Sequence, residues 1–317
     1  MSRLLKRLEG HLAGAPGGPG PGNAMPPPPA PPPKTHQEDP CLVRREVLDL
    51  DLGLLKALLG CTRKAGGLPP VLRAMLRRSP QEGHRGALLF DVEATGLSRG
   101  AGTLVFLLGM VRLGPDAVVL EQYFLRTPGL EAQLLQAFLD QLESRPLLIS
   151  YNGKSYDLAV LRNRLIINGL LPAPEAEPRT LPHLDLLHTG RALWKGTLTN
   201  HRLGTLEGEL LGLARGPGEL EGALMPAAWF SWLNTRDEAS LEAMMEHNRQ
   251  DLVSCLLLAQ RALEELLHSS SRPVAHNAAN LLAKARLWGP AGALAVGLGA
   301  EGLAKTSLRA WLRAGPG

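Results

Sequence analysis

The chain has 317 residues, of which 44% are hydrophobic and 20% charged. These values are typical of a soluble globular protein and exclude a chain too polar to build a core. The formal net charge of +4 is unevenly spread, because residues 1 to 85 carry 13 Lys and Arg against 7 Asp and Glu, whereas residues 86 to 317 carry 21 against 23. The basic N-terminal segment suits a polyanionic partner, and a solubilising tail is an equally good interpretation.

Cysteine spacing and hydropathy limit the classes of protein further. Cys41, Cys61 and Cys255 are far apart and form no CxxC pair, so neither a disulfide framework nor a zinc knuckle is supported. No apolar run is long enough for a membrane span, and the first 20 residues lack the apolar centre of a signal peptide. We therefore predict a cytoplasmic protein.

The first 85 residues are predicted to contain two segments. Residues 1–40 are expected to be a disordered tail, because Gly, Pro and Ala dominate from Gly10 to Gln37 and cannot bury enough apolar surface to fold. Residues 41–85 are predicted to form a short amphipathic helical lead-in, since leucines recur at helical intervals. These leucines are Leu48, Leu52, Leu55 and Leu59.

Residues 86–268 are predicted to form the main domain, in which three strands precede alternating helices and strands. The expected elements are strands from Ala87 to Glu93, Thr103 to Leu113 and Ala117 to Leu125, a helix from Leu130 to Leu142, a strand from Leu147 to Tyr151, a helix from Ser155 to Ile167, a short strand from His183 to His188, and a helix from Glu238 to Leu267. The order βββαβαβα predicts an α/β fold with a mixed sheet flanked by helices.

Residues 269–317 are predicted to be a small C-terminal helical segment. Ala and Leu dominate two stretches, Asn277 to Leu287 and Gly302 to Leu312. A helix pair of tetratricopeptide type is one interpretation, although two helices are too few to demonstrate a repeat.

Two carboxylates close the first strand of the main domain. Asp91 and Glu93 are two residues apart, so the alternation of a strand puts them on the same side. Two like charges beside a core strand are costly unless a cation lies between them. We therefore expect a divalent metal ion at this end of the strand.

Two further acids are expected near the same place. Asp157 begins the helix after the turn that starts at Tyr151, close to the carboxyl end of a strand, where open sheets usually place their sites. Asp251 lies one helical turn after His247 on the same face of the last long helix. Alone, Asp251 would be read as a surface acid and His247 as a packed histidine, but the four acids together favour a metal site.

Three motifs resemble those of a known family. The runs Asp91-x-Glu93-x-Thr95-Gly96-Leu97, Tyr151-Asn152-Gly153-Lys154-x-Tyr156-Asp157 and His247-Asn248-x-x-Asp251 are similar to the three motifs of the DEDD 3′–5′ exonucleases, the DnaQ-like members of the ribonuclease H-like superfamily. The resemblance is greatest to the bacterial YprB-like ribonuclease H-like domain and covers residues 86 to 266. It implies a ribonuclease H-like fold for this part of the chain.

The resemblance also implies a two-metal phosphodiesterase. Asp91 would bridge two Mg²⁺ or Mn²⁺ ions, Glu93 and Asp251 would complete one of them, and Asp157 would hold the other. His247 is the candidate general base, since histidine titrates near neutral pH. It stands four residues before the last Asp, the spacing of the family's tyrosine subclass, whereas the histidine subclass has five.

The same resemblance implies a nucleic-acid partner, expected to be the single-stranded 3′ end of DNA or RNA. Leu97 would pack on the terminal base, and Thr95, Asn152 and Lys154 would line the bound strand, the last two contacting phosphate or sugar in a sequence-independent way. A protein partner could bind the tail or the C-terminal helices.

Two other groups of residues are interpreted as structural. His183, Asp185 and His188 could suggest a metal site, but on a strand His188 would face away from His183. Trp229, Phe230 and Trp232 could stack on bases, although packing of a short helix is the preferred interpretation.

The prediction is a 3′–5′ exonuclease that hydrolyses DNA or RNA with two metal ions. A catalytically weak nucleic-acid-binding or scaffold protein of the same fold is the main alternative, and an endonuclease is a second. The choice between DNA and RNA stays open, because no motif fixes contacts around the sugar 2′ position.

Overall fold

A computed structural model describes most of the chain from residue 41 to residue 284. The described residues are 41–53, 55, 75, 86–96, 102–114, 117–144, 146–170, 181–216, 218–267 and 271–284. All of them belong to one compact unit, Asp39–Gly317. The predicted tail, residues 1–40, lies outside the described residues.

A six-stranded mixed sheet forms the centre of this unit, with the strand order β1-β4-β3-β2-β5-β6. The strands are β1 (Cys41–Leu48), β2 (Ala87–Ala94), β3 (Val105–Leu113), β4 (Val118–Leu125), β5 (Leu147–Ser150) and β6 (His183–Asp185). The first four strands pair antiparallel, and β5 and β6 join β2 in parallel. The predicted meander of three strands is confirmed as β2, β3 and β4.

Strand β1 corrects the predicted helical lead-in over Cys41–Leu48, whereas Gly53, Leu55 and Met75 are helical, as expected. It pairs with β4 along its whole length, from Cys41 opposite Leu125 to Leu48 opposite Val118. Its alternate residues Arg44 and Glu46 face helix α9 (Glu238–Leu267), where they pair with Glu242 and Arg249. The sequence did not indicate this strand, because its hydrogen-bonding partner β4 is distant along the chain.

The leucines behind the helical prediction have another role. Leu48, Leu52 and Leu55 are all buried in the same core cluster. Their burial makes the start of the segment part of the main domain. Leu59 lies outside the described residues.

Helices cover both faces of the sheet. In chain order they are α4 (Glu131–Leu142), α5 (Asp157–Ile167), α6 (Leu186–Leu193), α7 (Leu203–Leu206), α8 (Met225–Thr235), α9 and α10 (Arg272–Lys284). Short helical turns precede α4 and α8, at Pro128–Leu130 and Gly222–Leu224, and a π-helical turn, Glu207–Leu211, follows α7. The three long predicted helices are confirmed, and α9 has the bounds expected from the sequence.

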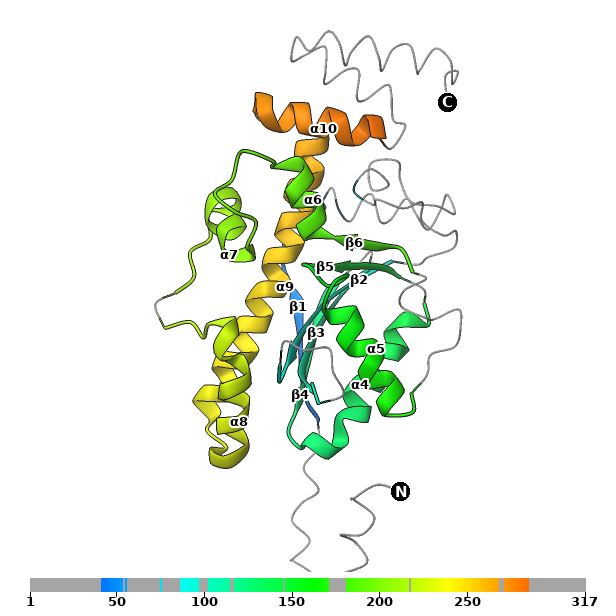
Figure 1. Ribbon diagram of the computed structural model, residues 1–317, viewed down its shortest axis with the longest axis vertical. Helices are drawn as coiled ribbons and strands as arrows, with labels where there is room; N and C mark the ends of the chain where they lie inside the picture. The colour runs from blue at the N-terminus through cyan, green and yellow to red at the C-terminus, as the bar shows by residue number, and fades with distance from the viewer. Residues whose placement is uncertain are drawn as a thin grey trace, which may run out of the picture. The chain divides into compact units, whose positions relative to one another are not determined.

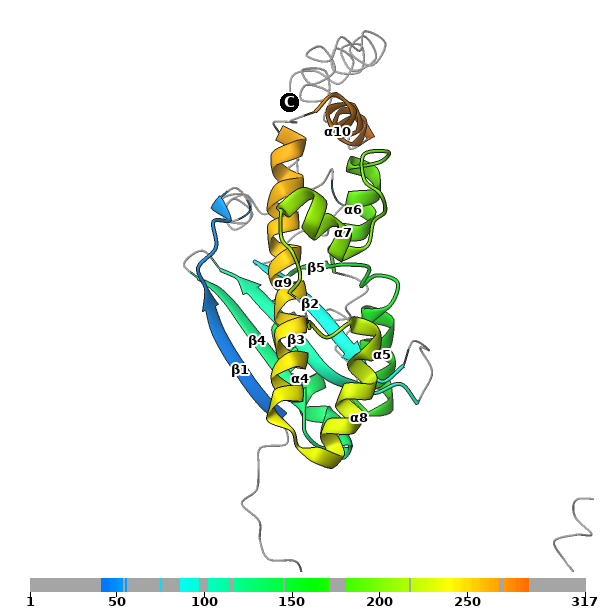
Figure 2. The same ribbon diagram turned by 90° about the vertical axis from the view of Figure 1, so that its left-hand side faces the viewer.

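The sheet separates two layers of helices, with α9 across one face and α4 and α5 on the other (Figures 1 and 2). The core divides in the same way: Leu89 and Val111 pack with Leu256 of α9, whereas Phe90 packs with Phe138 of α4. This alternation follows from the strand period of two. Residues of β2 with odd numbers therefore face α9.

A buried ion pair ties α4 to α5. Glu131 is 2% exposed and accepts hydrogen bonds from Arg164 Nε at 2.8 Å and from the Val105 N–H at 2.9 Å. The Asn168 side chain completes this arrangement. Because the carboxylate is saturated by donors, its burial is tolerated, and the helix layer is fixed to the edge of β3.

Strand β6 is shorter than predicted. It ends at Asp185, whose carboxylate caps helix α6 by accepting the Leu187 N–H at 3.1 Å. His188 therefore lies on a helix, and the argument that placed it on the opposite strand face from His183 was wrong. A capping acid is a strong local signal for a helix start.

The C-terminal part of the described chain packs against the domain. Asn277 of α10 donates hydrogen bonds to the Leu193 and Lys195 carbonyls at 3.0 and 3.1 Å. The second predicted helix, Gly302 to Leu312, lies outside the described residues. Among the described helices, including the 30-residue α9, none has both the length and the apolar character that a membrane crossing needs.

Candidate functional site

The site is built around the two carboxylates of β2, Asp91 and Glu93. Both side chains face α9, because they occupy the odd-numbered positions of the strand, while Phe90 and Val92 enter the opposite core. The pairing with β3 becomes irregular between Glu93 and Ala94, so the strand ends in a bulge directly after the second acid. Bulges often occur beside functional sites, where they redirect side chains.

An amide relay orients Asp91. Asn248 of α9 donates its side-chain N–H to Asp91 Oδ2 at 2.8 Å and accepts from Gln122 of β4 at 2.9 Å. The Gln122 amide also donates to the Met245 carbonyl at 2.7 Å. Because the Asn248 oxygen is occupied by a donor, its nitrogen is directed at Asp91.

A glycine makes room for this relay. Gly109 of β3 lies directly between Asp91 and Gln122 across the sheet. A Cβ at this position would lie 2.2 Å from Asn248 Oδ1 and 2.5 Å from Leu252 Cδ1. Only glycine therefore lets α9 approach the sheet closely enough for Asn248 to reach both side chains.

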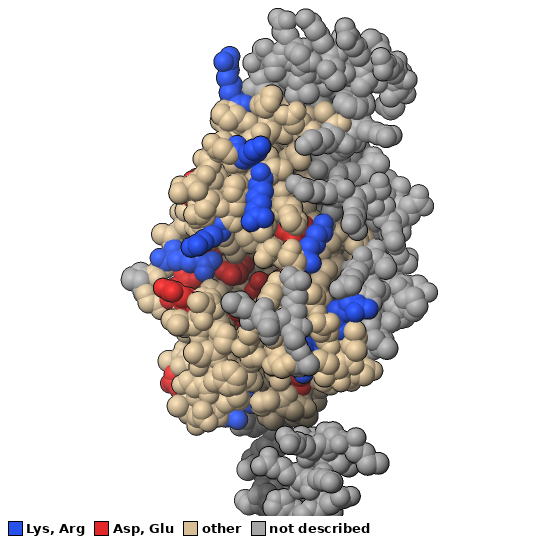
Figure 3. Space-filling model, viewed as in Figure 1, with Lys and Arg blue, Asp and Glu red and all other residues tan. Residues whose placement is uncertain are grey.

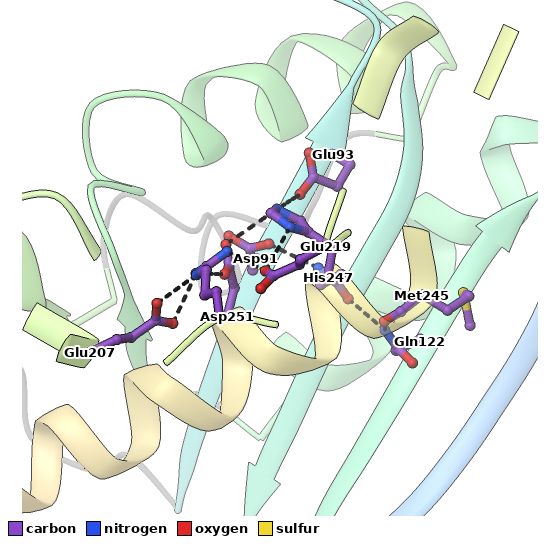
Figure 4. A network of polar contacts seen from close by, with 10 residues as sticks. Asp91, Glu93, Gln122, Glu207, Glu219, Met245, His247 and Asp251 are labelled. Atoms are coloured by element: carbon purple, nitrogen blue, oxygen red, sulfur yellow. Dashed lines mark hydrogen bonds and ion pairs between the residues drawn. The ribbon is translucent and has the colours of Figure 1, made fainter. Parts of the chain in front are cut away.

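His247 and Asp251 reach the site from one face of α9, as the sequence predicts. His247 is 4% exposed, and its Nε2 lies 3.6 Å from Glu93 Oε1 and 3.7 Å from Asp251 Oδ2. Its Nδ1 lies 3.6 Å from Glu219 Oε1 and has no hydrogen bond to any described residue. Figure 4 shows the His247 ring among these three carboxylates.

Asp157 is the first residue of α5 and is buried. The turn before it is tight, since a Cβ on Gly153 would lie 2.4 Å from Ser150 Oγ and 2.9 Å from Asp157 Oδ2. Asn152 takes a left-handed conformation with φ of 64°. The turn therefore brings the helix start close to the end of β5.

The four predicted ligands influence one another electrostatically. Burial, with the charge of Asp251, raises the pKa of Asp91 from its ordinary 3.8 to about 7. Burial and the charges of Asp91, Asp251 and Asp157 raise the pKa of Glu93 well above its ordinary range. Burial and Asp91 do the same to the pKa of Asp157. The structure thus gathers all four acids where their negative charges are unfavourable.

Burial also raises the pKa of Asp251, but His247 and Arg215 beside it oppose that shift. Arg215 lies in the segment between the π-helical turn and α8, and its guanidinium contacts Asp251 Oδ1 at 2.5 Å. It also pairs with Glu207 and Glu219, so one cation serves three carboxylates. The sequence analysis did not find Arg215, Glu207 or Glu219.

Asn248 was likewise missed as a site residue, although it lies inside the third motif. Its position directly after His247 on α9 is the signal that could have found it. By contrast, Arg215 lies in the segment 212–216, which has no regular structure, and its partner Asp251 on α9 is 36 residues away along the chain.

The predicted nucleic-acid contacts have different environments. Thr95 Oγ1 accepts the Leu104 N–H at 3.0 Å and so closes the turn after β2. Asn152 and Lys154 have exposed side chains, while their backbone N–H groups donate to Asp185 at 2.9 and 3.1 Å. Leu97 lies outside the described residues.

Four of the residues interpreted as structural have contacts in the core or hold a turn, whereas Phe230 is 50% exposed. His183 Nε2 lies 2.7 Å from Ser150 Oγ inside the core, and Asp185 holds the 152–154 turn and caps α6. Trp229 stacks on Phe106 at 5.2 Å between ring centroids, and Trp232 packs edge-on to Phe124 at 4.8 Å.

The donor set fits a hard divalent cation. Within the described part of the chain, no three His, Cys, Asp or Glu side chains converge closely enough to hold an ion as they stand. Asp91 is turned to Asn248 and Asp251 to Arg215. The predicted ligands are nevertheless all oxygen donors and mutually repelling, which is the chemistry that Mg²⁺ and Mn²⁺ satisfy.

On the molecular face shown in Figure 3, Asp and Glu side chains gather in one part, with Lys and Arg beside them. A polyanion approaching this face would meet basic groups next to acidic ones.

Together, the mixed sheet, its crossing helix and the carboxylates at the end of β2 define an α/β protein of the ribonuclease H-like class. The chain belongs to the RNase_H superfamily, whose family model matches residues 88–263. The predicted fold class and the predicted family are both confirmed.

The similarity to YprB proteins is also confirmed. Over 197 residues the chain is 36% identical to the uncharacterized protein YprB of Bacillus subtilis (strain 168), a match that covers 62% of this chain and 46% of that protein. The chain therefore spans about half the length of this curated relative.

Solved structures with some similarity include two DNA-processing enzymes. The family B DNA polymerase of Pyrobaculum calidifontis has a TM-score of 0.46 and 17% identity, over 65% of this chain and 29% of the polymerase. E. coli Exonuclease I, in complex with a dT13 oligonucleotide, has a TM-score of 0.34 and 16% identity, over 59% of this chain and 44% of the exonuclease.

Proposed function

We propose that the protein is a metal-dependent nuclease, and specifically a 3′–5′ exonuclease that uses two Mg²⁺ or Mn²⁺ ions. The observation that carries the proposal is the gathering of Asp91, Glu93, Asp157 and Asp251 from three separate elements, where burial raises all four pKa values and the charges of neighbouring carboxylates add to the shift. Folding would not be expected to tolerate such a cluster unless cations neutralise it.

The ions, held by these four carboxylates, would supply charge neutralisation at the scissile phosphate and lower the pKa of the attacking water. Asn248 would keep Asp91 in the orientation that the cluster requires, because its amide is fixed by Gln122. Gly109 supports this by letting α9 approach the sheet.

His247 would act as the general base. Its Nε2, between Glu93 and Asp251, would accept a proton from the attacking water, whose oxygen then bonds to phosphorus as the bond to the leaving 3′ oxygen breaks. The leaving oxygen takes up a proton, so the products are a shortened strand and a nucleotide.

The polarity and substrate come from the family motifs. Single-stranded DNA or RNA is the proposed partner, and the exposed residues Asn152 and Lys154, in the turn before α5, would contact it. Thr95 would contribute through the turn that it closes, and Leu97 through the segment that follows. Contacts of this kind act on the backbone and would be sequence-independent.

The test is a time course on end-labelled single-stranded DNA and RNA with Mg²⁺ or Mn²⁺. Asp91→Asn removes one charge and keeps the side-chain size, and we expect turnover to fall by on the order of 10²-fold or more. Asp140→Asn is the control, because Asp140 is an exposed acid on α4 that bonds only Gln136 among the described contacts.

The outcomes separate the alternatives. Stepwise shortening from the 3′ end that is lost with chelator and in Asp91→Asn supports the exonuclease. Cleavage of a circular strand would assign an endonuclease instead. An intact substrate that the parent protein binds with ions present would contradict the enzyme and favour the nucleic-acid-binding or scaffold role.

A further inference from the structure

Arg215 has no part in the chemistry proposed above, yet it is the most highly connected cation of the site. Its Nε and one terminal nitrogen bind the two oxygens of Glu207 at 2.6 and 2.8 Å. Its other terminal nitrogen binds Glu219 at 2.7 Å. The nitrogen shared with Glu207 also reaches Asp251 at 2.5 Å.

These contacts differ in strength. The pair with Glu207 is bidentate, and Glu207 is fully buried, so separating the two would leave an unpaired charge in the core. The contacts with Glu219 and Asp251 are single bonds, and these two side chains are 16% and 18% exposed. They are therefore the bonds that can exchange, and of the two acids only Asp251 is a predicted metal ligand.

We propose that Arg215 is a resident counter-ion of the carboxylate cluster, which competes with a divalent cation for Asp251 and so sets the affinity of the site for that cation. This inference rests on the proposed metal site. Arg215 remains anchored by Glu207 when it releases Asp251, so the exchange needs no large movement of the chain. A single guanidinium charge cannot neutralise the acids that surround it, whereas a divalent ion brings twice the charge to the same oxygens.

A competing Arg215 and a merely supporting Arg215 predict opposite changes in metal affinity when the residue is removed. If Arg215 only held Asp251 in place for the ion, removing it would weaken binding. If it competes, removing it will tighten binding, both because a positive charge leaves the site and because an oxygen of Asp251 becomes available. The sign of the change in affinity decides between the two.

The experiment is calorimetric titration of the full chain with Mn²⁺, without nucleic acid. We expect Arg215→Gln to bind Mn²⁺ roughly tenfold more tightly than the parent protein, a change of about 1.4 kcal/mol. The double variant with Glu207→Gln and Arg215→Gln removes one charge of each sign, so it isolates the direct competition for Asp251 from the change in net charge. It should also bind more tightly than the parent.

The matched control is Arg249→Gln. Arg249 lies on the same helix two residues before Asp251, makes a bidentate pair with Glu46, and has a side chain 31% exposed against 28% for Arg215. Its substitution removes the same charge without touching the cluster. We expect its affinity for Mn²⁺ to stay within about twofold of the parent.

Weaker or unchanged Mn²⁺ affinity in both Arg215 variants would overturn the proposal, as would the absence of Mn²⁺ binding to the parent protein. Melting curves recorded in chelator identify a variant that fails to fold. The double variant does not leave Glu207 as an unpaired buried charge, and it then supplies the answer. Turnover is measured separately. Loss of the proposed nuclease activity would leave the comparison of affinities intact, so the two proposals can fail independently.

Discussion

At the scale of single residues, three of the four acids of the cluster lie beside a polar partner. Asp91 is held by Asn248, Asp251 by Arg215, and Glu93 lies beside His247. These partners reduce the cost of gathering the acids but do not remove it, since the pKa of each acid stays raised. The acids are therefore oriented by their neighbours, but the site lacks the positive charge needed to neutralise them.

His183 makes the stability of the fold depend on pH. Burial, with smaller effects of Lys154 and His188, lowers its pKa from 6.5 to about 3. The unfolded chain therefore binds a proton at His183 that the folded protein excludes, and stability falls as pH decreases through the window from about 6.5 toward 3. Above 6.5 both states are neutral there, and the effect disappears.

We predict that His183→Gln flattens this part of the stability profile. The measurement is the free energy of unfolding in urea between pH 7 and pH 4, with the difference between variant and parent taken at each pH. His276→Gln is the control, because it removes a histidine from α10, far along the chain from β6. A His183→Gln profile parallel to that of the parent would contradict the prediction.

At the scale of elements, the site depends on the close docking of α9 onto β3. The row formed by Asp91, Gly109 and Gln122 crosses three strands, and Asn248 lies over the space that the glycine leaves. The helix supplies His247, Asn248 and Asp251 from one surface. A shift of α9 would therefore displace three site residues together.

Gly109→Ala tests this docking. The added Cβ would clash with Asn248 and Leu252, so we expect a loss of about 1–3 kcal/mol in the free energy of unfolding, as for an overpacked core. Gly129→Ala is the control, since a Cβ there meets nothing within 4 Å. Equal stability of the two variants, measured by urea unfolding, would show that α9 can adjust without cost.

At the scale of the whole molecule, cation binding and folding should be linked. The four carboxylates come together only in the folded chain, so an ion that binds them binds the native state selectively. At 100 times its dissociation constant, such an ion stabilises the fold by about 2.7 kcal/mol, which corresponds to a rise in melting temperature of roughly 5–10 °C.

We predict this rise for Mn²⁺ added to chelated protein, and its loss in Asp91→Asn. Asp140→Asn should respond like the parent, because Asp140 lies outside the cluster on α4. Thermal melts at several Mn²⁺ concentrations make the measurement. The same rise in Asp91→Asn would mean that the ion binds elsewhere on the chain.

The sequence by itself determined the periodic elements and the acids on them. The alternation of β2 was enough to place Asp91 and Glu93 on one face, and the helical period was enough to place His247 and Asp251 together on α9. These features depend only on neighbouring residues, whose spacing is visible in a single chain. The resemblance of the three motifs then indicated which acids belong together.

Only the tertiary structure decided which distant segments meet. Strand β1 was mistaken for part of a helical lead-in because its hydrogen bonds go to β4, and Arg215 was overlooked because its partners come from a turn and from α9. Asp185 seemed one of three similar residues on a strand, but it caps a helix and holds the neighbouring turn. Such contacts arise when segments that are distant along the chain pack together. The helical or strand periodicity of one segment does not indicate which other segment it will contact.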